Sequence, residues 1–335
     1  MVNPRPKSDL DRRCEIVLVK VFLQSYVYAI VQAASELKGE VPTNSCMNTL
    51  VKVNRSMDIY RYFRENHDGH SNTNAYLLAV LSFYIYNNMP PGSGAFEARF
   101  KDLFQRLSET DPFDIEIFAE DDAEVAILSN SRMVLVGFRG TDDDQGEWCG
   151  NLGNVPSNLS GVPSSWGSDV RVHAGVYNTL SKIYQSVRNE VRSRSENNRK
   201  RVFLTGHSRG AMLATLCAYR FQKVGSVAVA GVYVFGSPRV GNFGFRTRYE
   251  KDAELWNKTL RWAKNDDFAT KWPDYAFGVP RTPNRYFHVG RLNFINSNWQ
   301  VIMNHSNPDY EPGAELSIND HDMRNYCIFM HSRLL

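Results

Sequence analysis

The pentapeptide GHSRG, residues 206 to 210, places a lone hydroxyl, Ser208, between two glycines. The apolar run RVFLTG leads into it, and the small and apolar residues of RGAMLATLCAYRFQK follow it, so a strand is expected before it and a helix after it. This is the context of the G-x-S-x-G nucleophile elbow, in which a sharp turn lifts the serine hydroxyl above a sheet. Side chains at 206 and 210 would collide across so tight a turn. Ser208 is therefore the candidate nucleophile, and a purely structural turn is the alternative.

The segments around this turn alternate between strand-like and helix-like patterns. A helix buried on nearly every side is expected from Ala75, and a hairpin is expected from EVAILSN and RMVLVGF. Helices are expected in AGVYNTLSKIYQSVRNEVRS and at the end of the chain, and strands in VAVAGVYVFGS, TLRWAK and RYFHVG. This order predicts an α/β fold with a mainly parallel sheet covered by helices on both faces, where chemistry collects at the carboxyl ends of strands.

Several motifs together resemble the class-three lipases of the α/β-hydrolase fold, which include fungal triacylglycerol lipases. They run in the order VLVGFRGT, VHAGVY, FLTGHSRGA, VFGSPRVGN, KNDDFATKWP, FHVG and DHDMRNY, over roughly residues 75 to 330. The resemblance implies hydrolysis of lipid acyl esters through an acyl-enzyme. It assigns no chemistry to VFGSPRVGN.

A serine nucleophile needs a base, and α/β-hydrolases follow the chain order serine, acid, histidine. His288, in a strand-like segment, is expected to be packed, His305 lies in a polar stretch without a motif, and His331 is close to the terminus. The resemblance places the catalytic base at His321, in a turn before the last helix. His207, beside the serine, is expected to point away from the elbow and to pack.

Two neighbouring carboxylates, Asp266 and Asp267, are candidates for the acid, and only one of them can reach the imidazole. The resemblance favours Asp267. The chain departs from the family pattern here, because Ala269 stands where a proline is usual.

The tetrahedral intermediate of ester cleavage carries an oxyanion, which needs donors already in place. The elbow supplies the backbone N–H of Arg209, and the resemblance adds Thr141, whose hydroxyl would give a further bond. Arg139 is interpreted as a structural brace. The acidic run 142–144 is interpreted as a solvated loop, with calcium as the alternative, and residues 150–166 as either a lid or a plain surface loop.

Composition excludes several classes of protein. With 39 Lys and Arg against 36 Asp and Glu, the net charge of +3 gives little support to a nucleic-acid partner. Five scattered cysteines suit neither a disulfide scaffold nor a zinc site. We therefore expect no cofactor and no metal. The resemblance to class-three lipases implies a lipid ester at a membrane or droplet surface as the substrate.

The 335 residues are interpreted as an N-terminal helical extension, residues 1–70, and an α/β-hydrolase domain, residues 71–335. The apolar stretch 16–34 is interrupted by Lys20, which favours a buried or membrane-surface helix. A cleaved signal or a spanning anchor is the alternative. A cytoplasmic or peripheral-membrane location is expected, or secretion if this stretch is a signal. A catalytically silent lipase-like module, a phospholipase and a galactolipase remain as other functions.

Overall fold

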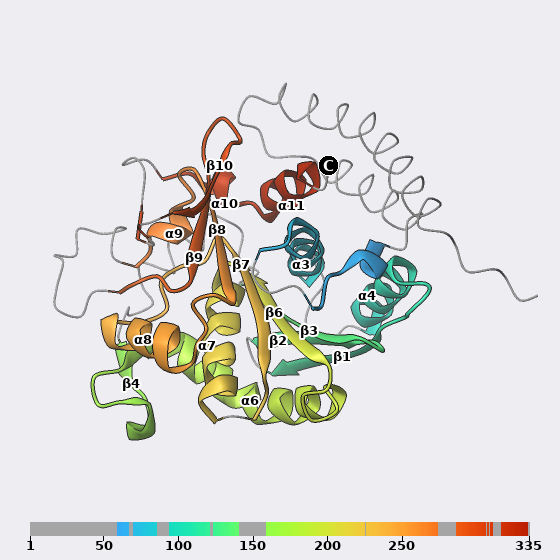
Figure 1. Ribbon diagram of the computed structural model, residues 1–335, viewed down its shortest axis with the longest axis horizontal. Helices are drawn as coiled ribbons and strands as arrows, with labels where there is room; N and C mark the ends of the chain where they lie inside the picture. Colours follow the sequence, from blue (N-terminus) through green and yellow to red (C-terminus); the bar gives the residue numbers. More distant parts are fainter. Residues whose placement is uncertain are drawn as a thin grey trace, which may run out of the picture.

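The structure is a computed structural model that describes residues 59–66, 70–85, 94–120, 123–140, 159–224, 226–273, 286–305, 307, 309–310 and 316–333. Its centre is a twisted sheet of eight strands, with helices on both faces (Figure 1). The strands, in chain order, are β1 (Asp114–Glu120), β2 (Ala123–Ser129), β3 (Met133–Phe138), β6 (Arg201–His207), β7 (Val229–Phe235), β8 (Thr259–Lys264), β9 (Arg291–Ile295) and β10 (Val301–His305). Strands β4 (Leu159–Gly161) and β5 (Arg171–His173) form a separate antiparallel pair.

The sheet is parallel at its centre and antiparallel at its edges. Neighbouring strands follow the order β1-β2-β3-β6-β7-β8-β9-β10. The four pairs from β3 to β9 are parallel, whereas β1, β2 and β3 form an antiparallel meander and β9 pairs antiparallel with β10. The α/β-hydrolase prediction of a mainly parallel sheet with helices on both faces is confirmed.

The helices divide between the two faces of the sheet. One face is covered by α3 (Asn72–Ile85), α4 (Gly94–Leu107) and α11 (Met323–Ser332), and the other by α6 (Ala174–Arg194) and α7 (Arg209–Val224). Successive residues of β3 alternate between the faces, with Leu135 in the core under α3 and Val136 in the core under α7. This alternation follows from the two-residue period of a strand.

The remaining described helices are short. They are α8 (Phe243–Thr247), the π-helical turn η3 (Arg248–Asp252), α9 (Phe268–Lys271), α10 (Ile318–His321), and the 3₁₀ turns η1 (Ile59–Tyr62) and η2 (Ser164–Trp166). The two that matter most for the site, α9 and α10, are single turns that contact each other. Isolated turns of this length are not stable alone, so surrounding contacts must hold them.

The expected secondary structure differs from the structure mainly at the C-terminal edge. A strand was expected in RYFHVG, but residues 286–290 contain only an isolated bridge, between Phe287 and Gly241, and the strand there is β9. His305, expected in a polar loop, ends β10. The hairpin β2–β3, the buried helix α3 and the last helix α11 are confirmed.

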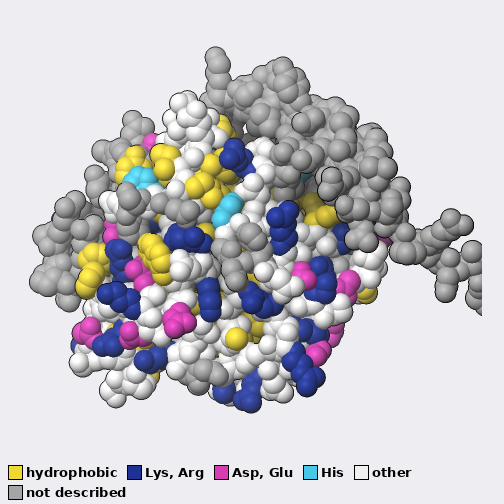
Figure 2. All heavy atoms as spheres, in the orientation of Figure 1, with side chains coloured by type: hydrophobic (Ala, Val, Ile, Leu, Met, Phe, Trp, Pro, Cys, Tyr) yellow, Lys and Arg dark blue, Asp and Glu magenta, His cyan; other side chains and the backbone are white. Residues whose placement is uncertain are grey.

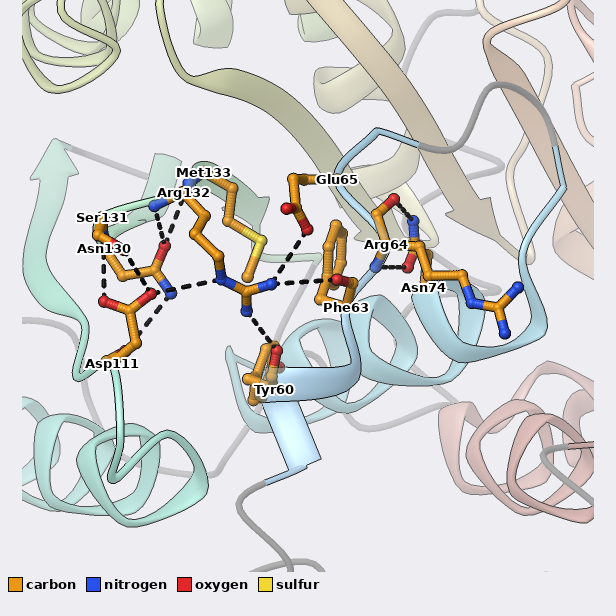
Figure 3. Close-up of polar contacts among 10 residues, drawn as sticks. All are labelled: Tyr60, Phe63, Arg64, Glu65, Asn74, Asp111, Asn130, Ser131, Arg132 and Met133. Atoms are coloured by element: carbon orange, nitrogen blue, oxygen red, sulfur yellow. Dashed lines mark hydrogen bonds and ion pairs between the residues drawn. The ribbon is translucent and has the colours of Figure 1, made fainter. Parts of the chain in front are cut away.

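Residues 59–66 pack against the hydrolase core, although we assigned them to the extension. Tyr60 and Phe63 are buried in the cluster under α3. Figure 3 shows the Arg132 guanidinium between this segment and the β2–β3 turn. It donates to the carbonyl oxygens of Tyr60 at 2.8 Å and Phe63 at 3.3 Å, and forms ion pairs with Glu65 at 3.0 Å and Asp111 at 3.4 Å. The division at residue 70 stays a prediction.

Charges of both signs are mixed on the visible surface (Figure 2). Some opposite charges are joined in ion pairs, such as Arg248–Asp252 and Arg246–Asp309, both at 2.8 Å. Within the described part of the chain, no helix is both long and apolar enough to cross a membrane. The stretch 16–34 lies outside the described residues.

Candidate active site

Ser208 lies at the turn between β6 and α7, in the strained backbone conformation of an elbow. Its φ is +57°, a left-handed value that non-glycine residues rarely adopt. The flanking glycines are required sterically. A Cβ atom at 206 would lie 2.4 Å from the Gly210 carbonyl carbon, and one at 210 would lie 2.2 Å from the Phe138 carbonyl oxygen. The elbow expected from GHSRG is thus present, at the carboxyl end of a central strand.

Asp267 and His321 form a hydrogen-bonded pair at the same edge of the sheet. Asp267 follows β8 and caps the N-terminus of α9, and its Oδ1 lies 2.8 Å from Nδ1 of His321, the last residue of α10. The same Oδ1 accepts from the Ala269 backbone N–H at 2.9 Å. A proline at 269 could not make this bond, because it has no N–H. The departure from the family pattern therefore gives the carboxylate an additional donor.

The environment of Asp267 keeps its carboxylate ionised. Burial by itself raises the pKa of Asp267, but the facing His321 and the hydrogen bonds from His321 and Tyr326 outweigh burial and lower it below its usual value. Tyr326, on α11, donates its hydroxyl to Oδ2 at 2.6 Å. Burial, and then the charge of Asp267, raise the pKa of Tyr326 well above its usual value, so this hydroxyl stays a donor.

Asp266, the other candidate for the acid, has different partners. Asp266 forms an ion pair with Lys271 at 3.1 Å and accepts from Asn265 at 3.1 Å. Neighbouring side chains at the start of α9 thus point in different directions, and Asp267 is the one that meets His321.

The other three histidines have separate partners. His288 is buried and its Nε2 donates to the Thr270 carbonyl at 2.8 Å. His305 stacks on Tyr310 with ring centroids 4.1 Å apart, and His331 packs edge-on against Tyr76. His288 is buried as expected for a packed histidine.

Sequence reasoning missed the position of His207. Its ring packs on the ring of His321, with centroids 4.4 Å apart and planes 30° from parallel. Its Nε2 lies 2.7 Å from the His321 carbonyl oxygen. We expected this side chain to pack away from the elbow, and it packs instead against the candidate base. Because His207 directly precedes Ser208, this contact also brings the candidate nucleophile and base to one edge of the sheet.

Gly236 was missed as well, because no chemistry was assigned to VFGSPRVGN. It follows β7 with φ +52°. A Cβ atom there would lie 2.8 Å from Oδ2 of Asp267 and 3.0 Å from Nδ1 of His321. The close approach of the backbone beneath the pair therefore requires glycine. Any side chain at this position would displace the acid or the imidazole.

The oxyanion candidates are only partly described. Arg209 is the first residue of α7, where backbone N–H groups lack intrahelical partners, and its side chain points to α6 and donates to Thr179 at 2.7 Å. Thr141 lies outside the described residues, as do the acidic run 142–144 and most of the segment considered as a lid. Arg139 forms an ion pair with Glu124, as expected of a brace. Among the described residues, no cluster of side chains suits a metal ion.

The geometry can be compared with known proteins. The model of the family "Lipase (class 3)" matches residues 135–277, which include Ser208 and Asp267. This stretch is similar in sequence to class 3 lipases. The resemblance inferred from the motifs is therefore confirmed for this part of the chain, although His321 lies beyond it.

The curated proteins to which this chain is similar include plant enzymes. The galactolipase DONGLE of Arabidopsis thaliana, described as chloroplastic, is 32% identical over 194 residues, or 48% of this chain and 40% of its own length. A chloroplastic phospholipase A(1) of the same plant is 33% identical over 167 residues, or 46% of this chain and 36% of its own length. The chain thus spans about two fifths of the length of these curated relatives.

Solved fungal lipases share the fold. Lipase II from Rhizopus niveus superposes with a TM-score of 0.58 at 17% identity, covering 76% of this chain and 95% of that one. The Rhizomucor miehei lipase propeptide complex superposes with a TM-score of 0.56 at 18% identity, covering 79% of each chain. At these identities the similarity establishes a shared α/β-hydrolase fold, and the chemistry has to be argued from the site.

Proposed function

We propose that this chain is a serine hydrolase that cleaves acyl esters of glycerolipids, with Ser208 as nucleophile, His321 as base and Asp267 as the acid that orients the base. The observation that carries the proposal is the 2.8 Å hydrogen bond from His321 to a buried carboxylate, at the sheet edge where Ser208 lies in a strained elbow. The match of residues 135–277 to class 3 lipases supports the same reaction.

The chemistry follows from this arrangement. Asp267 holds Nδ1–H of His321, so Nε2 takes the proton from the Ser208 hydroxyl as its oxygen attacks the ester carbonyl. The tetrahedral oxyanion is bound by the backbone N–H of Arg209, and we assign the second donor to Thr141. Collapse expels the alcohol, which receives the proton from His321. A water molecule then attacks the acyl-enzyme, with His321 again as base, and releases the fatty acid and Ser208.

The two plant relatives narrow the class of substrate. A galactolipase and a phospholipase A(1) both act on membrane glycerolipids, which favours a polar glycerolipid over triacylglycerol as the substrate of this chain. Such substrates are presented at a lipid surface. We accordingly propose a peripheral contact with a membrane or droplet, and the reaction as written needs no cofactor.

The decisive experiment compares wild-type protein with Ser208→Ala on a short-chain p-nitrophenyl ester, and then on phosphatidylcholine, a galactolipid and triacylglycerol in matched micelles. We expect the wild type to release fatty acid and the variant to lose activity by a factor on the order of 10⁴ or more. Equal hydrolysis by both proteins would refute the assignment of Ser208. Preference for triacylglycerol would refute the polar substrate class alone.

A silent lipase-like module is the competing function. A fluorophosphonate probe separates the two, because it labels only an activated serine. Labelling of wild type that is lost in both Ser208→Ala and His321→Ala supports an enzyme. Absence of labelling in the folded wild type would support the module.

A further inference from the structure

We propose that His207 is a positioning residue for the catalytic base: it holds the His321 imidazole and the turn that carries it in the orientation required for proton transfer. This inference rests on the proposed function, because it gives His207 a task only if His321 is the base. The contacts that carry it lie on two different parts of His321, its backbone carbonyl and its ring.

The first contact is a hydrogen bond to the main chain. The carbonyl oxygen of His321 can only accept, so His207 Nε2, 2.7 Å away, carries the proton and donates it. His321 is the last residue of α10, which is a single turn, and the terminal carbonyls of a helix have no partner within it. His207 therefore supplies an anchor from the rigid central sheet to a turn that is too short to hold its own orientation.

The second contact is with the ring. The ring centroids of His207 and His321 are 4.4 Å apart, with an angle of 30° between the ring planes. Phe268 packs edge-on against the same imidazole, with a centroid distance of 4.9 Å and an interplanar angle of 69°. With Nδ1 bound to Asp267, these two rings limit rotation of the imidazole. An imidazole that is already oriented loses less freedom on reaching the transition state.

The charge state of His207 suits this task. The titratable groups that face it are His321, Asp267 and Tyr326. Burial, followed by the charge of His321, holds the pKa of His207 well below its usual value, although Asp267 acts in the opposite direction. A neutral ring stacked on His321 does not repel the imidazolium that forms during proton transfer. A positively charged residue at 207 would oppose that step.

The position of His207 in the chain ties the two functional elements together. It is the last residue of β6 and is followed directly by Ser208. Any shift of the elbow therefore moves the anchor of the base with the nucleophile. This arrangement couples the position of the base to that of the nucleophile.

The test uses three substitutions in the full-length chain. His207→Gln keeps a donor near the position of Nε2 and removes the ring, His207→Phe keeps a ring and removes the donor, and His207→Ala removes both. His331→Phe is the matched control, because His331 is equally buried but packs on Tyr76. Steady-state kinetics on a p-nitrophenyl ester are recorded from pH 5 to 9, together with thermal unfolding.

We expect kcat to fall on the order of 10²-fold in His207→Ala, and by a smaller factor in the Gln and Phe variants. KM should be nearly unchanged, because a misplaced base slows the chemical step without weakening substrate binding. Partial recovery of kcat in the Gln and Phe variants relative to His207→Ala would show that the donor and the ring each help to position the base. His331→Phe should retain wild-type kinetics at pH 7.

Two results would overturn the inference. One is wild-type kcat in a folded His207→Ala protein. The other is an equal loss of kcat in all three variants, since a purely structural role of His207 would produce it. If His207→Ala does not fold, the Phe and Gln variants decide by the same criteria. Loss of activity in Ser208→Ala but not in His207→Ala would refute this inference and leave the proposed function intact.

Discussion

The hydroxyl of Tyr326 donates to Oδ2 of Asp267 at 2.6 Å, so the candidate acid is held from the side opposite His321. The same tyrosine oxygen accepts from the backbone N–H of Lys264 at 3.0 Å, which ties α11 to the end of β8. A residue of the last helix thus orients a carboxylate that follows a central strand. The candidate triad depends on the C-terminal helix as well as on the sheet.

Replacing Tyr326 with Phe should impair catalysis more than folding. A hydrogen bond to a charged group contributes about 1.5–3 kcal/mol, so we expect kcat/KM to fall about tenfold or more when the donor is lost. The pKa of Asp267 should rise, because one of the bonds that lower it is gone. Ester hydrolysis as a function of pH measures both effects.

Tyr249→Phe is the control for this change. Tyr249 is also buried and its hydroxyl bonds to Thr259 at 2.8 Å, but it lies in η3, away from the triad. It should lose a similar amount of stability with kcat/KM unchanged. Equal kinetic losses in both variants would show that Tyr326 has no specific effect on the acid.

The two neighbouring carboxylates should behave differently when each is neutralised. Asp267→Asn should lower kcat by a factor on the order of 10⁴, because the amide no longer holds the required imidazole tautomer. Asp266→Asn should mainly lower the free energy of unfolding, because it removes the partner of Lys271, whose side chain is 1% exposed. Kinetics and urea unfolding on the same samples separate the effects, and similar mild losses would place the acid elsewhere.

The ion pair of Lys264 and Asp320 should stabilise the turn that precedes the base. Their side chains are 10% and 12% exposed, and Asp320 also accepts from Asn265 at 3.0 Å. Removing one partner of a buried pair costs about 3–5 kcal/mol, because the other charge is left uncompensated. Lys264→Met and Asp320→Leu should each lower the free energy of unfolding in urea, and the double variant should lose less than the sum of the two. Additive losses would mean that the charges do not interact.

Stability should fall as the pH decreases from about 6.5 towards 4, partly because of His331. Burial lowers the pKa of His331 from 6.5 to about 4. Between these values the unfolded chain binds a proton that the folded chain does not, so the neutral folded form loses stability as the pH falls. A difference of this size corresponds to about 3 kcal/mol at most.

His331→Phe removes this proton uptake and should flatten the dependence of the unfolding free energy on pH over the same range. His173, whose pKa burial and Arg209 lower to about 4, would still contribute in that variant. Urea midpoints at pH 7 and pH 4.5 measure the change. An unaltered difference between the two midpoints would show that His331 does not contribute.

The central elements could be predicted from sequence because local patterns specify them. The apolar run before Ser208 and the small residues after it define β6 and α7, and TLRWAK coincides with β8. The edge strands β9 and β10 were harder, because their pairing depends on a hairpin whose alternation is weak. Local patterns thus identified the strand and the turn that carry the nucleophile better than the sheet edge beside them.

The orientation of side chains was the least predictable part of the site. The choice between Asp266 and Asp267 depends on which carboxylate caps α9, and the contact of His207 depends on where α10 lies. Both are tertiary relationships between segments separated by more than 50 positions. A histidine beside the elbow serine was the available signal, but only the fold shows what it touches.

The Arg132 contacts described with Figure 3 determine where the chain can be shortened. A protein expressed from residue 67 onwards would lack Tyr60, Phe63 and Glu65, leaving a guanidinium without most of its acceptors and a gap in the core. Biochemical dissection of the N-terminal region should therefore begin the catalytic fragment upstream of Ile59. Loss of activity in a shorter fragment would reflect a damaged core and would not identify a regulatory role for the missing residues.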